Sequence, residues 1–492
     1  MTSRTLPTRP RRATADMEFF DEADVVIVGL GAAGASAAIE AADAGATVLV
    51  LEAASAGGGT TAMAGGLIYM GGGTPTQKAC GVEDSTEDMC NYLMRAAGPN
   101  ADPERVRLYA EGSLEHYAWL VRQGMEFKPE FYAEKHTNTP GDEGLIYSGN
   151  EACHGFREHA RPAPRGHKGK VQGEGGGTLL MEKLIASATG KGVRIRCDSR
   201  ALTAILDDEG GVIGVVARID GAERNIRARR GLVLCAGGFI MNTEMLERHA
   251  PQLLRDTYPN GNPNDNGSGI RIGMGAGGAV MNMHEGFACL PFYPPACFIE
   301  AIMVDDKGQR FINEDCYHGS MGVRILERPG IRHYLVIDGA MFSALDKPPL
   351  GGFSVTATGE TIEELEAELR LPAGMLCHTL DFYNRHARDG KDPLFHKHAD
   401  YLRPLEPPYA ACEVTPGSGA FFPVFTLGGL RTLPGGEVLT EDAVPIPGLY
   451  AAGRTTAGLP RSGANYASGM SIGDATFFGR LAGRNAALSR LG

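Results

Sequence analysis

The first strong hydrophobic pattern along the chain is an apolar, β-branched run at residues 25–28. Its apolar positions follow one another without alternation, as in a strand that is buried on both faces. An alanine-rich stretch with helical character runs to residue 44, and a second apolar run follows at 47–51. The pattern therefore predicts a strand–helix–strand unit near the N-terminus.

Further apolar runs extend this pattern into an α/β fold. Buried strands are predicted around 232–235 and 449–452, and each is followed closely by glycine. Short strands with a turn at 207–211 predict a small β-meander between the first unit and these strands. The strands of this meander are expected at 193–195, 201–206, 212–219 and 225–228. Apolar residues at helical spacing predict a last helix over 471–491.

The turn after the first strand has the spacing of a dinucleotide-binding fingerprint. Gly29 suits the tight turn, Gly31 lets the backbone approach a pyrophosphate, and Gly34 lets the helix pack closely against the strand. The helix N-terminus then presents unpaired N–H groups and a positive dipole end to the phosphates. Glu52 ends the second strand, 18 residues after Gly34, where an acid accepts hydrogen bonds from ribose hydroxyls. A Rossmann-type dinucleotide site is therefore predicted.

Other glycine clusters favour FAD over NAD. The best candidate for a second fingerprint, at 273–278, has no strand before it and no acid at the right distance after it. A loop of small residues at 57–66 is able to run beside a flat ring system, and three strand ends return to one region. This fits a long cofactor. The predicted FAD-binding residues are Gly29, Gly31, Ala32, Ala33, Gly34, Glu52, Ala53, Thr60, Thr61, Ala64, Gly65, Gly66, Ala201, Ala236, Gly237, Gly238, Gly453, Ser471 and Ile472.

Composition excludes several other classes of protein. With 492 residues the chain is long enough for more than one domain, and its net charge of −12 argues against a nucleic-acid surface. No apolar run reaches the length of about 18 residues that a membrane span needs. None of the ten cysteines forms CxxC, so no metal site is predicted, and scattered thiols suggest a cytoplasmic protein. Residues 1–20 are expected to be disordered.

Several motifs together resemble the flavoprotein family that contains fumarate reductase flavoprotein subunits and 3-ketosteroid dehydrogenases. The resemblance covers about residues 23–485. It rests on GLGAAG at 29–34, GGGTTAMAGG at 57–66, LCAGGF at 234–239, GIRIGMGAGGA at 269–279, GQRFINE at 308–314, TLGGLRT at 426–432 and IPGLYAAG at 446–453.

The resemblance implies a domain arrangement and a mode of flavin binding. It implies a Rossmann-type FAD domain at 1–285 and 415–492, with an α+β catalytic domain inserted at 286–414. Covalent members attach flavin through a histidine in the loop that corresponds to 57–66, and no histidine occurs there. The implied FAD is therefore non-covalent.

The chain departs from the dicarboxylate-binding members of this family. Where those often carry an arginine, three residues past Glu314, this chain has Tyr317. The segment 338–342 offers no arginine and the segment 421–426 no histidine, so a dianion would meet a severe desolvation cost. An apolar pocket lined by Phe, Tyr, Met and Pro is expected instead.

Hydroxyl groups remain as the candidate catalytic residues. Tyr466 and Ser468 lie just before the last predicted helix, and Tyr317 is the third hydroxyl. Desaturation beside a ketone needs a base for the α-proton and donors for the ketone oxygen, on which enolate charge builds up. A tyrosine O–H and the backbone N–H groups of Gly469 and Met470 are the expected donors to this oxygen. Ser468 is expected to couple to either tyrosine, and its alternative role is a helix cap.

The arrangement is similar to that of the family's 3-ketosteroid Δ4-(5α)-dehydrogenases. The predicted function is C4–C5 desaturation of a 3-ketosteroid, with proton loss from C4 and hydride transfer from C5 to flavin N5. The alternatives are Δ1-desaturation, a fumarate- or acrylate-type reductase, and a flavin-binding protein without turnover. The predicted partners are an uncharged hydrophobic substrate and an electron acceptor whose identity the sequence does not indicate. His318 is expected to be structural, and Arg454 to bind backbone or flavin.

Overall fold

The computed structural model describes residues 6–293, 295–343 and 351–489. Its largest sheet has nine strands, in the order β1-β9-β10-β11-β2-β3-β8, with β22 beside β11 and β21 beside β22. These strands are β1 (Arg11–Arg12), β2 (Asp21–Val28), β3 (Val48–Leu51), β8 (Arg194–Arg196), β9 (Arg200–Leu206), β10 (Val212–Ile219), β11 (Ala222–Leu234), β21 (Glu437–Leu439) and β22 (Pro445–Ala451).

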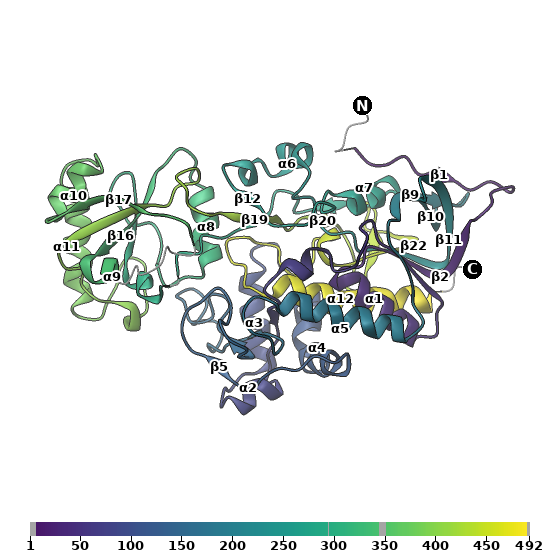
Figure 1. Cartoon of the computed structure of the whole chain (residues 1–492), viewed down its shortest axis with the longest axis horizontal. Helices are drawn as coiled ribbons and strands as arrows, with labels where there is room; N and C mark the ends of the chain where they lie inside the picture. The colour runs from purple at the N-terminus through teal and green to yellow at the C-terminus, as the bar shows by residue number, and fades with distance from the viewer. Residues whose placement is uncertain (1–5, 294, 344–350, 490–492) are drawn as a thin grey trace.

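The parallel part of this sheet contains the predicted strand–helix–strand unit. Strand β2 pairs in parallel with β3 on one side and with β11 on the other, and β22 extends the parallel order next to β11. Three helices run along one face of the sheet (Figure 1). They are α1 (Ala32–Asp43), α5 (Gly176–Gly190) and α12 (Met470–Leu488). Because Gly479 and Gly483 have no Cβ, α12 lies directly on the backbone of α1 at Ala33 and Ala37.

The meander differs from its prediction in two strands. Strand β8 is not part of it, because it pairs in parallel with β3. The strands expected at 225–228 and 232–235 are one strand, β11, which starts antiparallel to β10 and ends between β2 and β22. One long strand thus carries the chain from the meander into the parallel sheet.

The expectation of a disordered lead-in at 1–20 is wrong for residues 6–20, and residues 1–5 lie outside the described part of the chain. Strand β1 pairs in parallel with β9, through Arg11 with Ile205 and Arg12 with Leu206. Arg11 also donates to Asn225 Oδ1 at 2.7 Å. Arginine and proline composition suggested disorder, but the open edge of β9 provides backbone partners for this segment.

A second compact region has its own sheet and its own hydrophobic core. Its sheet has the order β15-β16-β18-β17, and a core cluster within 290–422 packs on it. The region lies at the opposite end of the molecule from the large sheet (Figure 1). Its elements are β15 (Ile302–Asp305), α8 (His318–Leu326), β16 (His333–Asp338), α9 (Gly339–Ser343), β17 (Val355–Gly359), α10 (Ile362–Glu368), α11 (Met375–Ala387) and β18 (Tyr409–Glu413).

Short strands and helices connect these two parts. A three-stranded ribbon in the order β12-β19-β14 lies between them, and a further group of helices packs below α12 (Figure 1). These elements are β4 (Ile68–Tyr69), α2 (Pro75–Ala79), α3 (Thr86–Ala96), α4 (Pro103–Arg122), β5 (Phe131–Tyr132), β6 (Leu145–Ile146), β7 (Gly166–His167), α6 (Thr243–His249), β12 (Tyr258–Pro259), α7 (Ser268–Gly275), β13 (Val280–Met281), β14 (Gly286–Ala288), β19 (Pro423–Thr426) and β20 (Gly429–Leu430).

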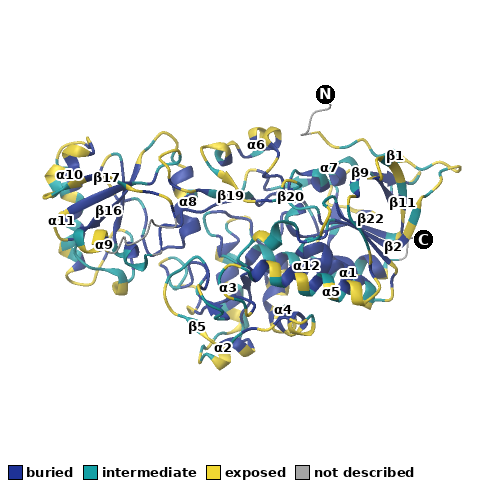
Figure 2. Cartoon of the chain, in the orientation of Figure 1, coloured by how far each residue is buried: buried dark blue, intermediate teal, exposed yellow. Residues whose placement is uncertain are grey.

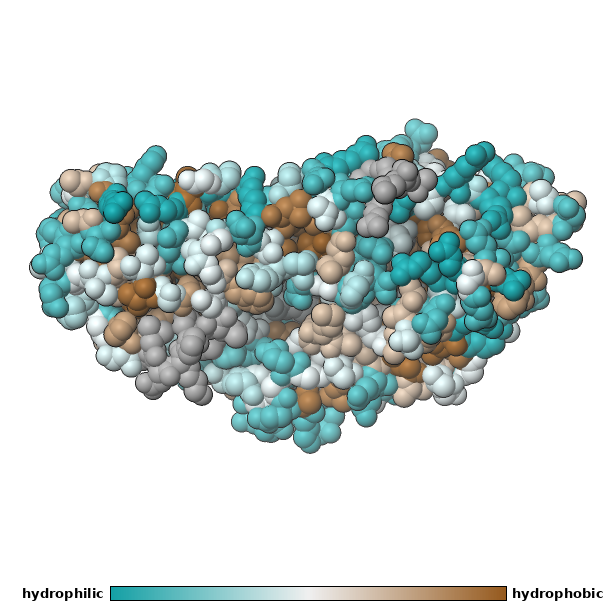
Figure 3. Space-filling model, turned by 45° about the horizontal axis from the view of Figure 1, so that its top comes forward, coloured by the Kyte–Doolittle hydropathy of each residue, from teal (hydrophilic) through white to brown (hydrophobic). Residues whose placement is uncertain are grey.

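Burial follows these layers. The central strands of both sheets and the inner faces of α1 and α12 are buried, whereas exposed residues lie at the edge strands, the outer helices and the loops (Figure 2). On the face drawn in Figure 3, hydrophilic residues surround small groups of hydrophobic ones. Among the helices of the described ranges, none is long and apolar enough to cross a membrane.

Candidate active site

A single cavity of about 610 Å³ runs between the large sheet and the second region. The residues that line one end of it include Gly31 and Glu52, and those that line the other end include Tyr317 and Tyr466. The cavity therefore joins the predicted dinucleotide site to the predicted catalytic residues.

The glycine turn at the first end has the geometry that its sequence predicts. Gly29 has φ of +99°, and Gly34 packs so tightly that a Cβ there would lie 1.9 Å from the Gly29 carbonyl oxygen. At Gly31 the space is open, because the nearest atoms to an added Cβ are 4.0 Å away. Helix α1 begins here without a side-chain cap, so its first N–H groups face the cavity as an anion site.

Glu52 is held rigidly at the wall of the same end. Its carboxylate accepts hydrogen bonds from the backbone N–H groups of Leu30, at 2.7 Å, and Ala54, at 2.8 Å. The residue is buried, yet it still lines the cavity. Each carboxylate oxygen has a further lone pair, so the side chain is able to receive ribose hydroxyl groups as well.

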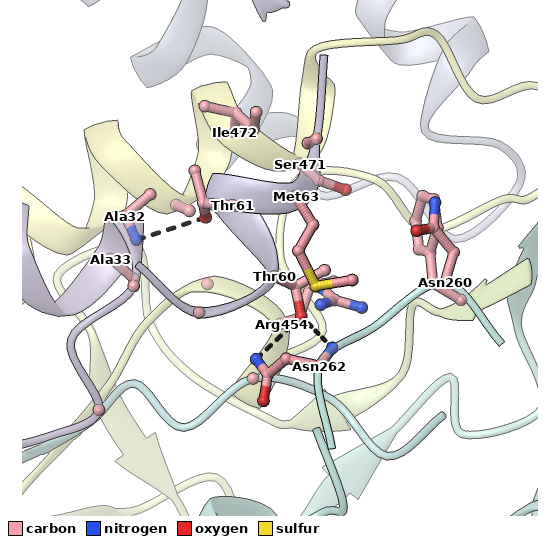
Figure 4. Close-up of a pocket in the computed structure, with 18 of the residues that line it drawn as sticks. Ala32, Ala33, Thr60, Thr61, Met63, Asn260, Asn262, Arg454, Ser471 and Ile472 are labelled. Atoms are coloured by element: carbon pink, nitrogen blue, oxygen red, sulfur yellow. Dashed lines mark hydrogen bonds between the residues drawn. The ribbon is translucent and has the colours of Figure 1, made fainter. Parts of the chain in front are cut away.

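The small-residue loop at 57–66 crosses above the glycine turn and is tied to it. Thr61 Oγ1 accepts from the N–H of Ala32 at 3.4 Å, and Thr60 Oγ1 accepts from the N–H of Asn262 at 3.1 Å (Figure 4). Arg454 lies behind Thr60 in this view and donates to Asp265 Oδ2 at 2.5 Å. Ser471 and Ile472, from the start of α12, close the upper side (Figure 4).

Of the predicted cofactor residues, all but Gly34 and Gly238 line this cavity. Gly34 acts through helix–strand packing, as described above. Gly238 lies behind the wall, where a Cβ would meet Thr426 Oγ1 at 2.4 Å. Both positions therefore require glycine for packing. Neither residue lines the cavity, so neither is placed to contact the cofactor directly.

At the other end the structure brings two of the predicted hydroxyl groups together. Tyr317 Oη lies 2.5 Å from Ser468 Oγ, although the two residues are 151 positions apart in sequence. The third hydroxyl, of Tyr466, donates to Ser471 Oγ at 3.0 Å and accepts from the Ser471 N–H at 3.2 Å. Ser468 is thus coupled to Tyr317. It is not the cap of α12, since the N-cap is Gly469.

The electrostatics of this end disfavour charge. Burial raises the pKa of Tyr317 well above its usual range, and the hydrogen bond with Ser468 opposes that rise. Burial also raises the pKa of Tyr466, while its two hydrogen bonds with Ser471 lower it. His318 lines the cavity beside Tyr317, and burial lowers its pKa to about 3, which leaves the ring neutral at pH 7.

Only one of the two expected backbone donors faces the cavity. Gly469 lines the cavity with φ of +94°, and in the described part of the chain its N–H has no acceptor. Met470 is fully buried away from the cavity, and its N–H donates to the Ala467 carbonyl at 3.2 Å. The expectation for Met470 is therefore wrong, because the first turn of α12 uses that N–H group.

Aromatic rings form the walls around the hydroxyl groups. The rings of Phe287 and Phe425 stack with centroids 4.7 Å apart, and Phe287 lies 4.8 Å from Tyr466. The other aromatic, proline and methionine side chains of the lining are Met63, Tyr258, Pro259, Pro291, Phe421 and Pro423. The expected apolar lining is therefore present.

The arginines that line the cavity are already engaged. Arg200 donates to Asn264 Oδ1 at 2.6 Å, and Arg454 pairs with the buried carboxylate of Asp265. Asp265 balances the charge of Arg454, although Nη1 of that arginine has no hydrogen-bond partner among the described residues. The arrangement therefore favours an uncharged guest.

Sequence reasoning missed a group of asparagines on the wall opposite the glycine turn. Asn260, Asn262 and Asn264 line the cavity from the segment that follows β12. The signal was present as an Asn- and Gly-rich stretch at 259–268, with six residues of these two types in its first nine positions. Asn138 and Glu174 also line the cavity, and no motif marked them.

Comparison with known proteins identifies the family. The FAD binding domain family matches residues 24–472. The chain belongs to this family. The protein is therefore an FAD-binding flavoprotein. The glycine turn, the uncapped start of α1, the anchored carboxylate of Glu52 and the cavity that they line all fit this cofactor.

Three members of the family were compared with this flavoprotein by sequence identity, by coverage and, for the two solved structures, by TM-score. The 3-ketosteroid-Δ4-(5α)-dehydrogenase of Rhodococcus jostii RHA1, solved with 4-androstene-3,17-dione, is 44% identical, with a TM-score of 0.93 over 97% of this chain and 99% of that one. The 3-oxo-5-alpha-steroid 4-dehydrogenase of Comamonas testosteroni is 28% identical, over 89% of this chain and 93% of that protein. A flavocytochrome c3 fumarate reductase is more distant, with 26% identity and a TM-score of 0.66 over 96% of this chain and 79% of that one.

Proposed function

We propose that this flavoprotein is an oxidoreductase that introduces a C4–C5 double bond into a 3-ketosteroid. The observation that carries the proposal is the pair of hydroxyl groups of Tyr317 and Ser468, 2.5 Å apart in an apolar cavity continuous with the FAD site. The likeness to two proteins named for steroid Δ4-dehydrogenation supports it. When bound, FAD supplies the acceptor for the hydride that leaves C5.

The ketone oxygen is held by Tyr466 and Gly469. Tyr466 keeps the hydrogen bond from the Ser471 N–H, which makes its own O–H a stronger donor once it turns from Ser471 Oγ to the ketone. The Gly469 N–H is the second donor, at the positive end of α12. With Tyr466 turned in this way, both donors serve the atom on which enolate charge builds up, and a buried site makes such donors effective.

The C4 proton passes to the Tyr317–Ser468 pair. In its singly deprotonated form the pair shares one proton between two oxygens, and accepting the C4 proton makes both hydroxyl groups neutral. The short hydrogen bond stabilises the deprotonated form, whereas burial destabilises it. Proton transfer to a positioned base of this kind contributes about 10²- to 10⁴-fold to a rate.

The aromatic walls select the substrate by excluding water and charge. Phe287 and Phe425 stack against each other beside the hydroxyl groups and offer flat apolar surface to a rigid ring system. A dicarboxylate would lose hydration there without gaining an unbalanced positive charge from Arg454, because the buried carboxylate of Asp265 already balances that charge. This favours a ketosteroid over a fumarate-type substrate.

Three further features of the protein belong to the proposal. The FAD is non-covalent, because the loop at 57–66 has no histidine to carry a link. The domains are an FAD domain at 1–285 and 415–492 and a catalytic domain at 286–414, a division supported by the separate core cluster within 290–422. All ten cysteines are free thiols, which supports a cytoplasmic setting.

The test is turnover of the C4–C5-saturated 5α counterpart of 4-androstene-3,17-dione. We expect the purified protein to lose its oxidised-flavin colour anaerobically with this substrate and to yield the 4-ene. Succinate serves as the matched test of the dicarboxylate alternative, and the 4-ene itself as the test of Δ1-desaturation. A product with the double bond at C1–C2, or colour loss with succinate alone, contradicts the proposal.

A further inference from the structure

The two hydroxyl groups of the proposed base come from distant parts of the chain, yet a single short segment contacts the backbone of both. Tyr317 is the N-cap residue of α8, and Ser468 lies in the turn before α12. Between them runs the 148–150 segment, which comprises Ser148, Gly149 and Asn150. All three of its residues are buried.

Each end of the 148–150 segment makes one hydrogen bond toward the pair. The carbonyl oxygen of Ser148 accepts from the Ser468 N–H at 2.8 Å. The side-chain oxygen of Asn150 accepts from the Tyr317 N–H at 2.7 Å. Two residues of extended chain span about 7 Å at most, so the segment limits how far the two backbones are able to separate.

Asn150 is itself fixed by further buried contacts. Its Nδ2 donates to Ser320 Oγ at 2.8 Å, and its N–H donates to Tyr92 Oη at 3.0 Å. Helix α8 has no side-chain cap of its own, so Asn150 supplies one from outside the helix. With the amide oxygen and the amide nitrogen both in use, its side chain has one orientation.

We infer that Asn150 is a positioning residue for proton transfer, and that it acts by fixing the backbone of Tyr317 relative to Ser468. The inference rests on the proposed function, since it assigns Asn150 to the step in which C4 loses its proton. Asn150 does not line the cavity, so its effect on the reaction passes through the Tyr317 N–H. A misplacement of about 1 Å in such an arrangement is able to cost about 100-fold in rate.

The test compares Asn150→Ala with Asn384→Ala in the holoenzyme. Asn384 is a matched control, because its side chain also makes two hydrogen bonds, here with the backbone N–H and carbonyl of Leu405, and it does not line the cavity. The readouts are kcat, KM, the pH dependence of kcat, and the kinetic isotope effects of substrates deuterated at C4 or at C5.

For Asn150→Ala we expect kcat to fall about 10- to 100-fold while KM changes less than about threefold. The C4 isotope effect should rise, because proton removal becomes slower relative to the other steps, and the C5 effect should not. The pH at which kcat rises should move upward, because a longer bond to Ser468 lowers the Tyr317 pKa less. Asn384→Ala should retain the parent isotope effects and pH profile.

Unchanged isotope effects and an unchanged pH profile in Asn150→Ala would overturn the inference. If that variant does not fold, Gly149→Ala takes its place, because the new Cβ would lie 2.5 Å from the Ala467 Cβ, beside Ser468, and displace the same segment. The same changes are expected from it, and their absence overturns the inference equally. Failure of the parent enzyme to turn over any 5α-3-ketosteroid would instead refute the proposed function.

Discussion

Removal of the Tyr317 hydroxyl should nearly abolish flavin reduction and leave substrate binding largely intact. Tyr317→Phe keeps the ring, which is only 2% exposed, and removes the oxygen that lies 2.5 Å from Ser468 Oγ. We expect the rate of flavin reduction to fall about 10²- to 10⁴-fold, the range for loss of a general base. This corresponds to an activation free energy that is higher by about 2.7–5.4 kcal/mol.

Anaerobic stopped-flow absorbance at about 450 nm, the band of oxidised flavin, measures this rate directly. Tyr383→Phe is the matched control, because Tyr383 is a buried tyrosine whose hydroxyl donates to the Glu300 carbonyl at 3.2 Å, outside the cavity. Ser468→Ala and the double variant with Tyr317→Phe complete a double-mutant cycle. Since the two hydroxyl groups act as a unit, the double variant should be no slower than the slower single one.

The pH dependence gives a second readout of the same variant. Burial raises the pKa of Tyr317, so its proton-accepting form grows only as pH rises into the alkaline range. The parent rate should therefore increase with pH, and the rate of Tyr317→Phe should not follow it. A reduction rate within threefold of the parent, or a cycle in which the two effects multiply, would refute the role of the pair.

Two further predictions concern the cofactor site and the second region. Gly34→Ala should purify with much less FAD, measured from the flavin-to-protein absorbance ratio, because its Cβ would meet the Gly29 carbonyl at 1.9 Å; full FAD content would contradict this packing argument. Arg310→Met should unfold at lower temperature in calorimetry, by loss of about 3–5 kcal/mol, since it leaves the carboxylates of Glu314 and Asp392 buried without this cation. An unchanged transition would show that Lys397 alone compensates for the missing charge.

The parts of the fold that sequence predicted are those with strong local patterns. The run at 25–28, the glycines after it and Glu52 fix a strand–helix–strand unit through sterics and hydrogen bonding within about 30 residues. The structure places the predicted loop at 57–66 and the start of α12 on the same cavity. These are cases in which short-range chemistry decides the conformation.

The predictions that failed depended on pairings distant in sequence. No local pattern shows that residues 11–12 find the edge of β9, or that 222–234 form one strand shared by two parts of the sheet. The sequence alone does not decide whether Ser468 meets Tyr317 or Tyr466 for the same reason, because the observed contact with Tyr317 spans 151 residues. The prediction that the Met470 N–H is an oxyanion donor failed for a local reason. That group already donates to the Ala467 carbonyl at the start of α12.

The most direct test of the account is a crystal structure of the Tyr317→Phe holoenzyme with a 5α-3-ketosteroid that is saturated at C4–C5. We predict the ketone oxygen within hydrogen-bond distance of Tyr466 Oη and the Gly469 N–H, with C4 facing Ser468 Oγ. A steroid whose C1–C2 edge faces Ser468, or whose ketone points away from Tyr466, would contradict the proposed chemistry.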